Sequence, residues 1–422
     1  MRFMHLTAAV GTLAMAGATV PSVRAADFAP VPYVSGTIKP NHRSQTELDK
    51  ALVDFYRAWK SVYVVQDCGP GRYFVKVDAD HKPVAGGTAA GTITVSEAHG
   101  YGMLITAMMA GADPHAQKIF DGMVLYFRDH PARSDANLLA WNQVAGCENA
   151  GDDVGGDNTA TDGDLDIGYA LLLADATWGS DGAIDYRAEA DKVMTAILKH
   201  EVDPTSDFLL IGDWAGRGDD ATYAATTRSS DFMMSHLAAF AQASGDPRWL
   251  SVRDRTYTII NAVRAGFSLR TGLMPDFIVG LPQSPAPAPS GFIEGESDGD
   301  YSWNAGRYPW RIGLDYLLNG DQRALNAVRP LNAWARRATG GVPQEFADTY
   351  RVDGSVPPGH GKNSMAFVSL LGVSAMAEPG NQRWLNAIWD TVTDKTVSDE
   401  DYFGNTLKLL AMISMSGHWA RP

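Results

Sequence analysis

The sequence predicts an all-α protein in which about twelve amphipathic helices form one large domain. Apolar residues recur with helical spacing along almost the whole chain, and the alternation typical of β-strands is scarce. The segments between the periodic stretches are rich in Gly, Asp and Pro, as connecting loops are. The composition changes sharply nowhere, so nothing marks a second domain.

Each expected helix rests on its own periodic stretch. Phe232, His236 and Phe240 show the i, i+4, i+8 spacing well, and Phe403 and Leu407 begin a similar series. Twelve such helices could pair as six hairpins closed into a ring, with the inner helices buried by an outer layer. We expect helices near residues 45–59, 96–110, 115–129, 164–176, 184–199, 229–243, 247–265, 301–318, 321–338, 362–376, 382–392 and 401–415.

The first 25 residues resemble an export signal and not part of the fold. Arg2 precedes an apolar run over 6–20, and the small residue Ala25 suits a cleavage site. The run is too short for a membrane span, although a lone N-terminal anchor helix is the alternative. We therefore expect a signal peptide over 1–25, a mature domain over 26–422, and a bacterial protein that is periplasmic or secreted.

The charge balance narrows the class of partner. The chain carries 35 basic and 49 acidic side chains, for a formal net charge of −14. This argues against nucleic acid, which is bound through basic surface. It is compatible with a neutral polysaccharide and equally with a cationic polymer.

The chain has two cysteines, Cys68 and Cys147. In an oxidising compartment an isolated pair most often forms one disulfide, which we expect here, with two buried thiols as the alternative. Two sulfur atoms without a histidine cluster make a structural zinc site improbable.

The first of three acidic clusters surrounds Glu97, in the stretch SEAHGYGM. Ser96 can cap the helix that follows, which places Glu97 in its first turn. There it could simply complement the helix dipole. As a general acid, Glu97 would need burial or a neighbouring carboxylate to raise a pKa that a helix N-terminus lowers.

Two further clusters also precede helices. The stretch TATDGDLDI contains Asp162, Asp164 and Asp166, and a helix cap would explain only one of them. A calcium loop is excluded because Ile167 stands where the EF-hand pattern requires Gly. The third cluster runs from Glu294 to residue 300 and could be an ordinary solvated loop, but Trp, Tyr and Arg residues follow it directly.

Together these motifs are more specific than any of them alone. The stretches VSEAHGYGMLI, ATDGDLDIGYALLLAD and NAGRYPWRIGLDYLL closely resemble three signatures of glycoside hydrolase family 8, in the same order. The resemblance implies an (α/α)6 barrel with an open cleft across one end. It also implies endo-acting cleavage of β-1,4 linkages with inversion at the anomeric carbon, and no metal or organic cofactor.

The resemblance assigns roles to several residues. Glu97 matches the general acid, and Asp162 matches the carboxylate that binds and helps distort the sugar at the cleavage point. Asp164 is the nearest rival for that second role. Arg307 matches a cleft arginine that orients the water-activating side.

One position departs from the pattern. Asn304 stands where the cellulase-like branch of the family has its aspartate base, and an amide cannot accept a proton from water at neutral pH. Another branch takes its base from a glutamate in a preceding inserted loop. This chain has such a loop after the proline-rich stretch 280–290, so Glu294 is the expected base and Glu296 the alternative.

Aromatic residues beside these loops are candidates for stacking on sugar rings. They are Tyr101, Trp141, Trp214 and Trp303, whereas Trp178, Trp334 and Trp389 have helical spacing and are expected in the core. The substrate stays open between cellulose derivatives, mixed-linkage β-glucan and chitosan. A non-catalytic polysaccharide-binding protein and a metal-dependent enzyme are the rival functions, and a monomer is the expected state.

Overall fold

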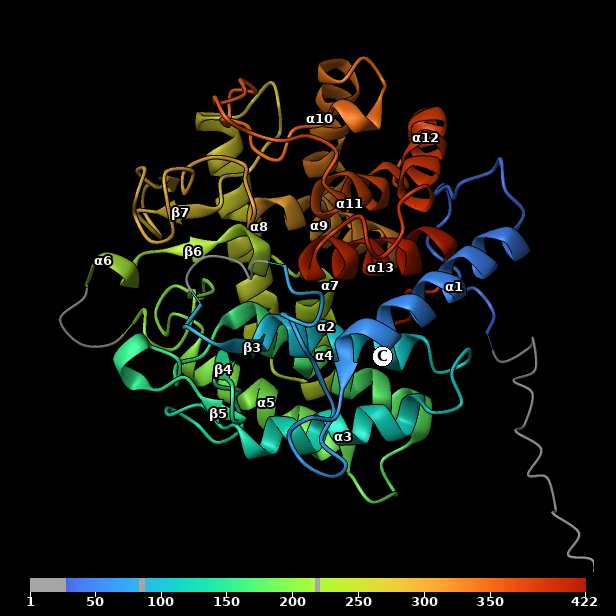
Figure 1. Ribbon diagram of the computed structural model, residues 1–422. Helices are drawn as coiled ribbons and strands as arrows, with labels where there is room; N and C mark the ends of the chain where they lie inside the picture. The colour runs from blue at the N-terminus through green and yellow to red at the C-terminus, as the bar shows by residue number, and fades with distance from the viewer. Residues whose placement is uncertain (1–27, 83–87, 217–220) are drawn as a thin grey trace, which may run out of the picture.

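The computed structural model describes residues 28–82, 88–216 and 221–422 (Figure 1). The predicted signal peptide therefore lies outside the described residues. All twelve expected helices are present, together with a four-residue helix α6 (Ala221–Ala224). The long helices are α1 (Gln45–Tyr63), α2 (Ser96–Met108), α3 (Ala116–Asp129), α4 (Thr161–Trp178), α5 (Tyr186–His200), α7 (Met234–Ser244), α8 (Arg248–Gly266), α9 (Tyr308–Asn319), α10 (Gln322–Ala338), α11 (Met365–Ala375), α12 (Gln382–Thr393) and α13 (Tyr402–Ser416).

The helices form two concentric layers. The inner helices α2, α4, α7, α9, α11 and α13 contact one another in this order, and α13 returns to contact α2, so the ring is closed. The outer helices α1, α3, α5, α8, α10 and α12 each pack against the inner helix next to them in the chain, with α1 on α13. This arrangement is the (α/α)6 barrel, which confirms the predicted fold class.

The two layers differ in sequence as their positions require. Inner helix α11 (MAFVSLLGVSA) is buried on every face, whereas outer helix α10 buries only an apolar stripe. Glycines let inner helices approach closely: a Cβ on Gly100 would lie 2.9 Å from Gly163 O, and one on Gly163 would lie 2.5 Å from Ser96 Oγ. The first turns of α2 and α4 therefore lie against each other.

Three small antiparallel sheets were not predicted, because strands of two to four residues are too short to show alternation. In Figure 1 the labelled strands β3, β4, β5, β6 and β7 lie in the left half of the view. β3 runs directly into α2, and β6 lies just before α7. The sheets pair β1 (Val64–Val65) with β2 (Phe74–Val75), β3 (Thr92–Val95) with β4 (Asn142–Val144) and β5 (Glu148–Asn149), and β6 (Thr227–Arg228) with β7 (Phe277–Val279) and β8 (Ala286–Pro287).

The two ends of the described chain close the far end of the barrel, at the C-termini of the inner helices. Val31 N donates to Gly417 O at 2.8 Å, and Ile38 N donates to Met376 O at 2.9 Å. The Phe28 ring stacks on His418 with centroids 4.0 Å apart. With this end covered, the N-terminal ends of the inner helices are left for a binding site.

The structure joins Cys68 and Cys147 in a disulfide, with Cα atoms 5.6 Å apart and a sequence separation of 79. The bridge connects the loop between β1 and β2 to the turn between β4 and β5. It lies beside the buried rings of Phe74 and Tyr126. The bridge thus fixes two loops on either side of the segment that carries Glu97.

Candidate active site

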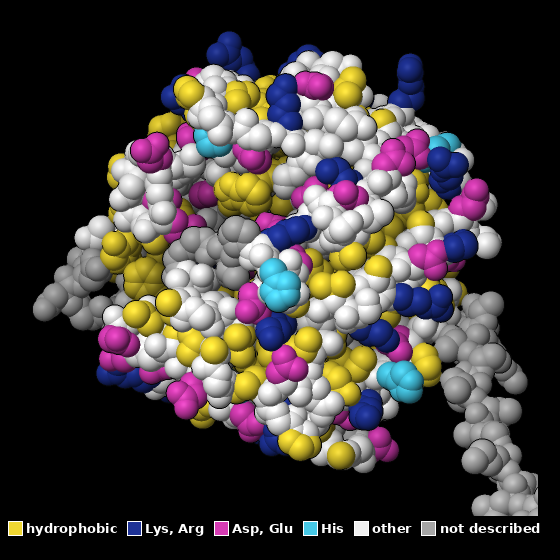
Figure 2. Space-filling view, viewed as in Figure 1, with side chains coloured by type: hydrophobic (Ala, Val, Ile, Leu, Met, Phe, Trp, Pro, Cys, Tyr) yellow, Lys and Arg dark blue, Asp and Glu magenta, His cyan; other side chains and the backbone are white. Residues whose placement is uncertain are grey.

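A cleft of about 620 Å³ lies over the N-terminal ends of the inner helices. Glu97, Asp162, Glu294, Asn304 and Arg307 all line it, although they come from segments up to 210 residues apart. Figure 2 shows this face hollowed, with apolar side chains inside the hollow and acidic side chains around it. Such a volume is typical of sites that bind small organic ligands or parts of larger ones.

Glu97 occupies the first turn of α2, directly after strand β3. Ser96 N donates to Trp141 O at 2.8 Å, which fixes the start of the helix against the neighbouring loop. Burial raises the pKa of Glu97 to about 7, against the lowering effect of Arg307 and with a further rise from the charge of Asp162. Burial therefore outweighs the neighbouring arginine charges and raises the pKa of Glu97, as a general acid requires.

Asp162 lies in the first turn of α4, beside Glu97, and it is buried. Arg307 Nη1 donates to Asp162 Oδ2 at 2.9 Å, and Arg228 Nη2 lies 2.9 Å from Oδ1. Burial opposes ionisation of Asp162, but Arg228 and Arg307 outweigh it and lower the pKa of this carboxyl. Glu97 and Asp162 are therefore adjacent carboxyl groups with opposite pKa shifts, one protonated near neutral pH and one charged.

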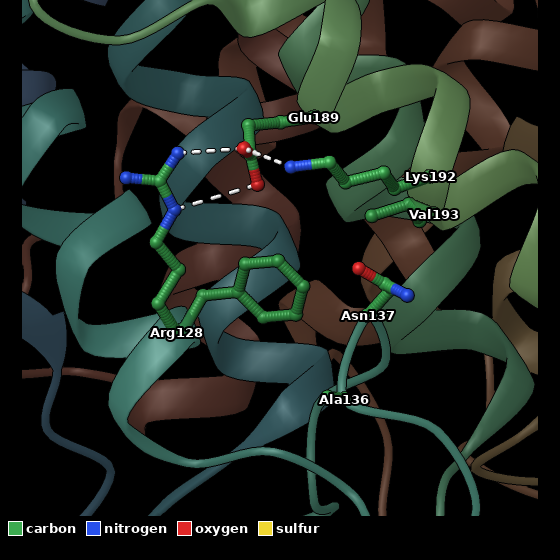
Figure 3. A pocket seen from close by; sticks show the side chains of 7 residues that line it. Arg128, Ala136, Asn137, Glu189, Lys192 and Val193 are labelled. Carbon is green, nitrogen blue, oxygen red and sulfur yellow. Dashed lines mark hydrogen bonds and ion pairs between the residues drawn. The ribbon is translucent and has the colours of Figure 1, made fainter.

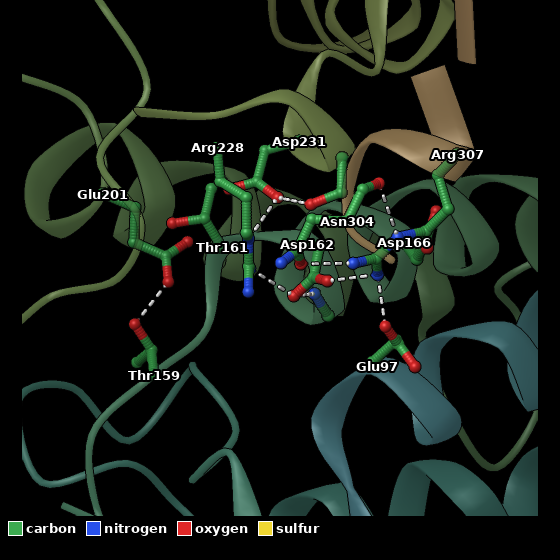
Figure 4. A network of polar contacts seen from close by, with 12 residues as sticks. Glu97, Thr159, Thr161, Asp162, Asp166, Glu201, Arg228, Asp231, Asn304 and Arg307 are labelled. Atoms are coloured by element: carbon green, nitrogen blue, oxygen red, sulfur yellow. Dashed lines mark hydrogen bonds and ion pairs between the residues drawn. The ribbon is translucent and has the colours of Figure 1, made fainter. Parts of the chain in front are cut away.

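Arg307 connects the two sides of the site (Figure 4). Its Nη1 donates to Glu97 Oε2 as well as to Asp162, and its Nη2 donates to Asn304 Oδ1 at 2.7 Å. The side chain is 3% exposed. A buried guanidinium held by these acceptors gives the site a fixed positive centre.

Asn304 Nδ2 donates to Glu294 Oε2 at 2.9 Å, so a continuous polar chain runs from Glu97 through Arg307 and Asn304 to Glu294. The loop of Glu294 is held by Asp298, which is buried and accepts hydrogen bonds from the backbone N–H of Ile293, Glu294 and Gly295. Glu296 lies in the same loop and also lines the cleft, and both glutamates are exposed. This geometry places Glu294, and not Glu296, in contact with Asn304.

Asp276 fixes the turn that carries Asn304. Its Oδ1 accepts from Ser302 N at 2.9 Å and from Ala305 N at 2.7 Å, and its carboxyl lines the cleft. Burial raises the pKa of Asp276 to about 7, the N–H of Ala305 opposes this rise, and the charge of Glu294 adds to it. Asp276 thus positions Asn304, and its burial disfavours its own charged form.

Aromatic rings form the apolar part of the cleft. Trp303 is 44% exposed and its ring contacts Phe367 and Phe403 edge-on or tilted. Trp141 lines the cleft beside α2, with its Nε1 donating to Gly155 O at 2.9 Å. Trp303 and Trp141 are thus available to stack on sugar rings, as the sequence predicts for them.

Three predicted substrate contacts need correction. Tyr101 is fully buried below the cleft, where its hydroxyl accepts a hydrogen bond from Arg307, because α2 is an inner helix without a solvent face. Trp214 is half-buried against Tyr223 and does not line the cleft. Asp164 points away from it: Asp164 Oδ1 accepts from Leu139 N at 3.0 Å, and the carboxyl is also bonded to Glu201.

The three tryptophans expected in the core also differ from one another. Trp389 is 2% exposed and belongs to the main core. Trp178, at the C-terminal end of inner helix α4, and Trp334, on outer helix α10, are partly buried and pack against that core.

Sequence reasoning missed three residues of the site. Arg228 and Asp276 lie in the segments TTRSSD and LMPDF, each with a single acidic or aromatic neighbour and without the dense acidic clusters that marked the other motifs. Phe403 was assigned to an apolar helix face but lines the cleft under Arg307, whose Cζ lies 5.6 Å from the ring centroid. In each case the signal is a contact between distant segments.

A second, smaller hollow lies between α3 and α5 and shares no residue with the cleft (Figure 3). Its charged groups are paired with one another: Glu189 accepts from Arg128 and Lys192. The hollow has no titratable group free for chemistry. Among the residues that the structure describes, no group of three or more His, Cys, Asp or Glu side chains is placed to hold a metal ion.

Comparison with known proteins identifies the class. The family model "Glycosyl hydrolases family 8" matches residues 50–417, and the chain belongs to this family of glycoside-cleaving enzymes. It is 43% identical over 387 residues to the beta-glucanase of Niallia circulans, covering 92% of this chain and 89% of that protein. It is 38% identical to an endoglucanase of Bacillus sp. (strain KSM-330), covering 92% and 80%.

Solved structures agree with the fold. The apo structure of a beta-1,3-1,4-glucanase from Paenibacillus sp. X4 matches with a TM-score of 0.85 and 43% identity, covering 93% of this chain and 98% of that one. Rex8A from Paenibacillus barcinonensis matches with a TM-score of 0.71 at 15% identity, which supports the fold alone. No helix of the described chain is both long and apolar enough to span a bilayer.

Proposed function

We propose that this hydrolase cleaves internal β-1,4 linkages of a glucan-type polysaccharide with inversion at the anomeric carbon. The observation that carries the proposal is the polar chain across the cleft, with Glu97 at one end and Glu294 at the other. Inverting enzymes need an acid and a base on opposite sides of the scissile bond, with room for a water molecule between them. The glucan substrate is supported by the glucanases among the relatives.

In the proposed reaction Glu97 donates its proton to the oxygen that leaves. Glu294 takes a proton from water, and the oxygen of that water bonds to the anomeric carbon as the glycosidic bond breaks. Asp162 stays ionised between Arg228 and Arg307 and stabilises positive charge on the sugar ring. Asn304 keeps Glu294 in place through its amide.

Export and oligomeric state belong to the same proposal. The N-terminal signal over 1–25 would direct the enzyme to the periplasm or the exterior, where polymeric glucan is met, and the disulfide suits an oxidising compartment. The enzyme would act as a monomer.

One screen tests the proposed function. The purified protein is incubated with barley β-glucan, carboxymethyl cellulose, chitosan and xylan, and new reducing ends are measured, with Glu97→Gln as the control for contaminating enzymes. We expect hydrolysis of a glucan, a rapid fall in viscosity, and α-anomers as the first products by NMR. Release of products from chitosan alone would show that the substrate is chitosan and not a glucan. Activity on none of the four polymers would refute the proposal.

A further inference from the structure

Asp164 and Glu201 form a buried pair of carboxyl groups behind the segments that bring Trp141 and Asp162 to the cleft. Both side chains are 0% exposed. Asp164 lies in the first turn of α4, two residues after Asp162, and Glu201 directly follows α5. Since Asp164 does not reach the cleft, neither carboxyl of this pair has a role in the proposed reaction.

Each carboxyl has one oxygen with a clear partner. Asp164 Oδ1 accepts from Leu139 N at 3.0 Å, and Glu201 Oε1 accepts from the hydroxyl of Thr159, as Figure 4 shows for the latter. The other two oxygens, Asp164 Oδ2 and Glu201 Oε2, are buried and have no donor from another residue. The two carboxyl groups are nevertheless hydrogen-bonded to each other. Two carboxylates cannot form such a bond unless one of them carries a proton.

The surroundings favour the protonated form. Beyond the pair itself, the charge of Asp213, from the loop after α5, raises the pKa of both carboxyls, and the charge of Asp162, from α4 itself, raises that of Asp164. No lysine, arginine or histidine of the described chain forms an ion pair with Asp164 or Glu201. Burial raises the pKa of Asp164 to about 8, and it raises the pKa of Glu201 as well. A second negative charge here would be buried without compensation.

We propose that Asp164 and Glu201 share one proton and act together as positioning residues for the two cleft segments that carry Trp141 and Asp162. Through Leu139 N the pair holds the strand-like segment that leads to Trp141, and through Thr159 it holds the entry to α4 with Asp162. Thr159 is held in addition by Asp213, whose Oδ1 accepts from Thr159 N at 3.0 Å. The shared proton thus ties α5 to two segments of the cleft.

Because the pair needs the shared proton, the stability that it contributes to the fold depends on pH. Because the folded pKa of Asp164 lies above its value in an unfolded chain, the folded state binds the proton more tightly. The pair therefore stabilises the fold at acid pH, and its contribution declines as the pH rises from about 4 to about 8. Glu97 and Asp276 have raised pKa values of the same sign, so a variant of the pair itself is needed to isolate its effect.

Glu201→Gln is that variant. The amide can donate to Asp164 Oδ2 and accept from Thr159 without a shared proton, so the contacts survive while the titration is lost. We expect the fall in Tm of Glu201→Gln between pH 6 and pH 9 to be roughly half that of the wild type or less. Glu201→Ala, which leaves Asp164 without its partner, should have a lower Tm at every pH. Glu189→Gln is the matched control, because Arg128 and Lys192 pair with Glu189 outside the cleft, and its pH slope should equal that of the wild type.

The measurement is of thermal unfolding and needs no substrate, so its outcome is independent of the proposed function. A wild-type pH slope in Glu201→Gln would overturn the shared proton. An unchanged Tm in Glu201→Ala would overturn the positioning role. If Glu201→Gln does not fold, Asp164→Asn replaces it, with the same flattened slope expected and the same unchanged slope refuting the proposal.

Discussion

Asn304 Nδ2 donates to Glu294 Oε2 at 2.9 Å, while Asn304 Oδ1 accepts from Arg307 Nη2 at 2.7 Å. The amide therefore acts as donor to one neighbour and acceptor from the other. An aspartate at this position could accept from Arg307 but could not donate to Glu294. The asparagine that stands in place of the usual base is thus the residue that orients Glu294, the base we propose.

Asn304→Asp should consequently lower activity and not restore a second base. The new carboxylate would lose the bond to Glu294 and place a like charge beside it. Loss of a hydrogen bond to a charged group corresponds to about 1.5–3 kcal/mol, so we expect kcat to fall by roughly tenfold or more. Steady-state kinetics on the best substrate of the screen measure it. A gain in kcat would show that position 304 can still serve as the base.

Glu294→Gln should be nearly inactive, with a loss of about 10²–10⁴-fold in kcat if Glu294 is the general base. Glu296→Gln is the control in the same loop and should keep much of its activity, since Asn304 Nδ2 donates to Glu294 and not to Glu296. Azide should restore turnover of Glu294→Gln by direct attack, which gives a glycosyl azide of inverted configuration. If Glu294→Gln kept wild-type turnover and Glu296→Gln lost it, Glu296 and not Glu294 would be the general base.

The sequence predicted the helices and the acidic motifs because both are local. Helical spacing is repeated within each segment, and Glu97 and Asp162 follow loop signals at the first turns of inner helices. Whether a side chain on an inner helix reaches the cleft depends on how the helices pack, and not on its neighbours in the sequence. Tyr101 and Asp164 lie within four residues of catalytic groups, yet α2 and α4 are buried on nearly every face and turn both side chains away from the cleft.

Residues that act through distant contacts also escaped prediction. Arg228 becomes part of the site only because β6 brings it to Asp162, and Asp276 only because its carboxyl accepts from Ser302 and Ala305. Neither segment differs in composition from an ordinary loop. The fold is thus readable from periodicity and the proposed catalytic acids from motifs, whereas the groups that shift the pKa values of these acids can be found only in the tertiary structure.

Glu97 should set the alkaline limit of activity. A general acid must be protonated, and the pKa of Glu97 is raised to about 7, chiefly by burial. We expect kcat/KM to fall as the pH rises through about 7, by tenfold for each further pH unit. Glu97→Gln should lower kcat by about 10²–10⁴-fold while leaving substrate binding nearly unchanged.

Glu189→Gln, outside the cleft, is the control for Glu97→Gln and should keep the pH profile of the wild type. The profile is recorded on a soluble substrate over pH 4–9, with stability checked at each pH. Near-normal turnover of a natural polysaccharide by Glu97→Gln would show that the acid lies elsewhere.

The bridge between Cys68 and Cys147 should stabilise the protein and leave the chemistry unchanged. It closes a loop with a sequence separation of 79, and the loss of chain entropy in the unfolded state corresponds to roughly 4 kcal/mol. Denatured, unreduced protein should show no titratable thiol, and the double variant Cys68→Ser, Cys147→Ser should unfold at lower temperature. Because the bridge lies outside the residues that line the cleft, kcat at a temperature where both proteins are folded should agree within about twofold. Two thiols titrated in the unreduced protein would refute the bridge, and an unchanged Tm in the double variant would refute its contribution to stability.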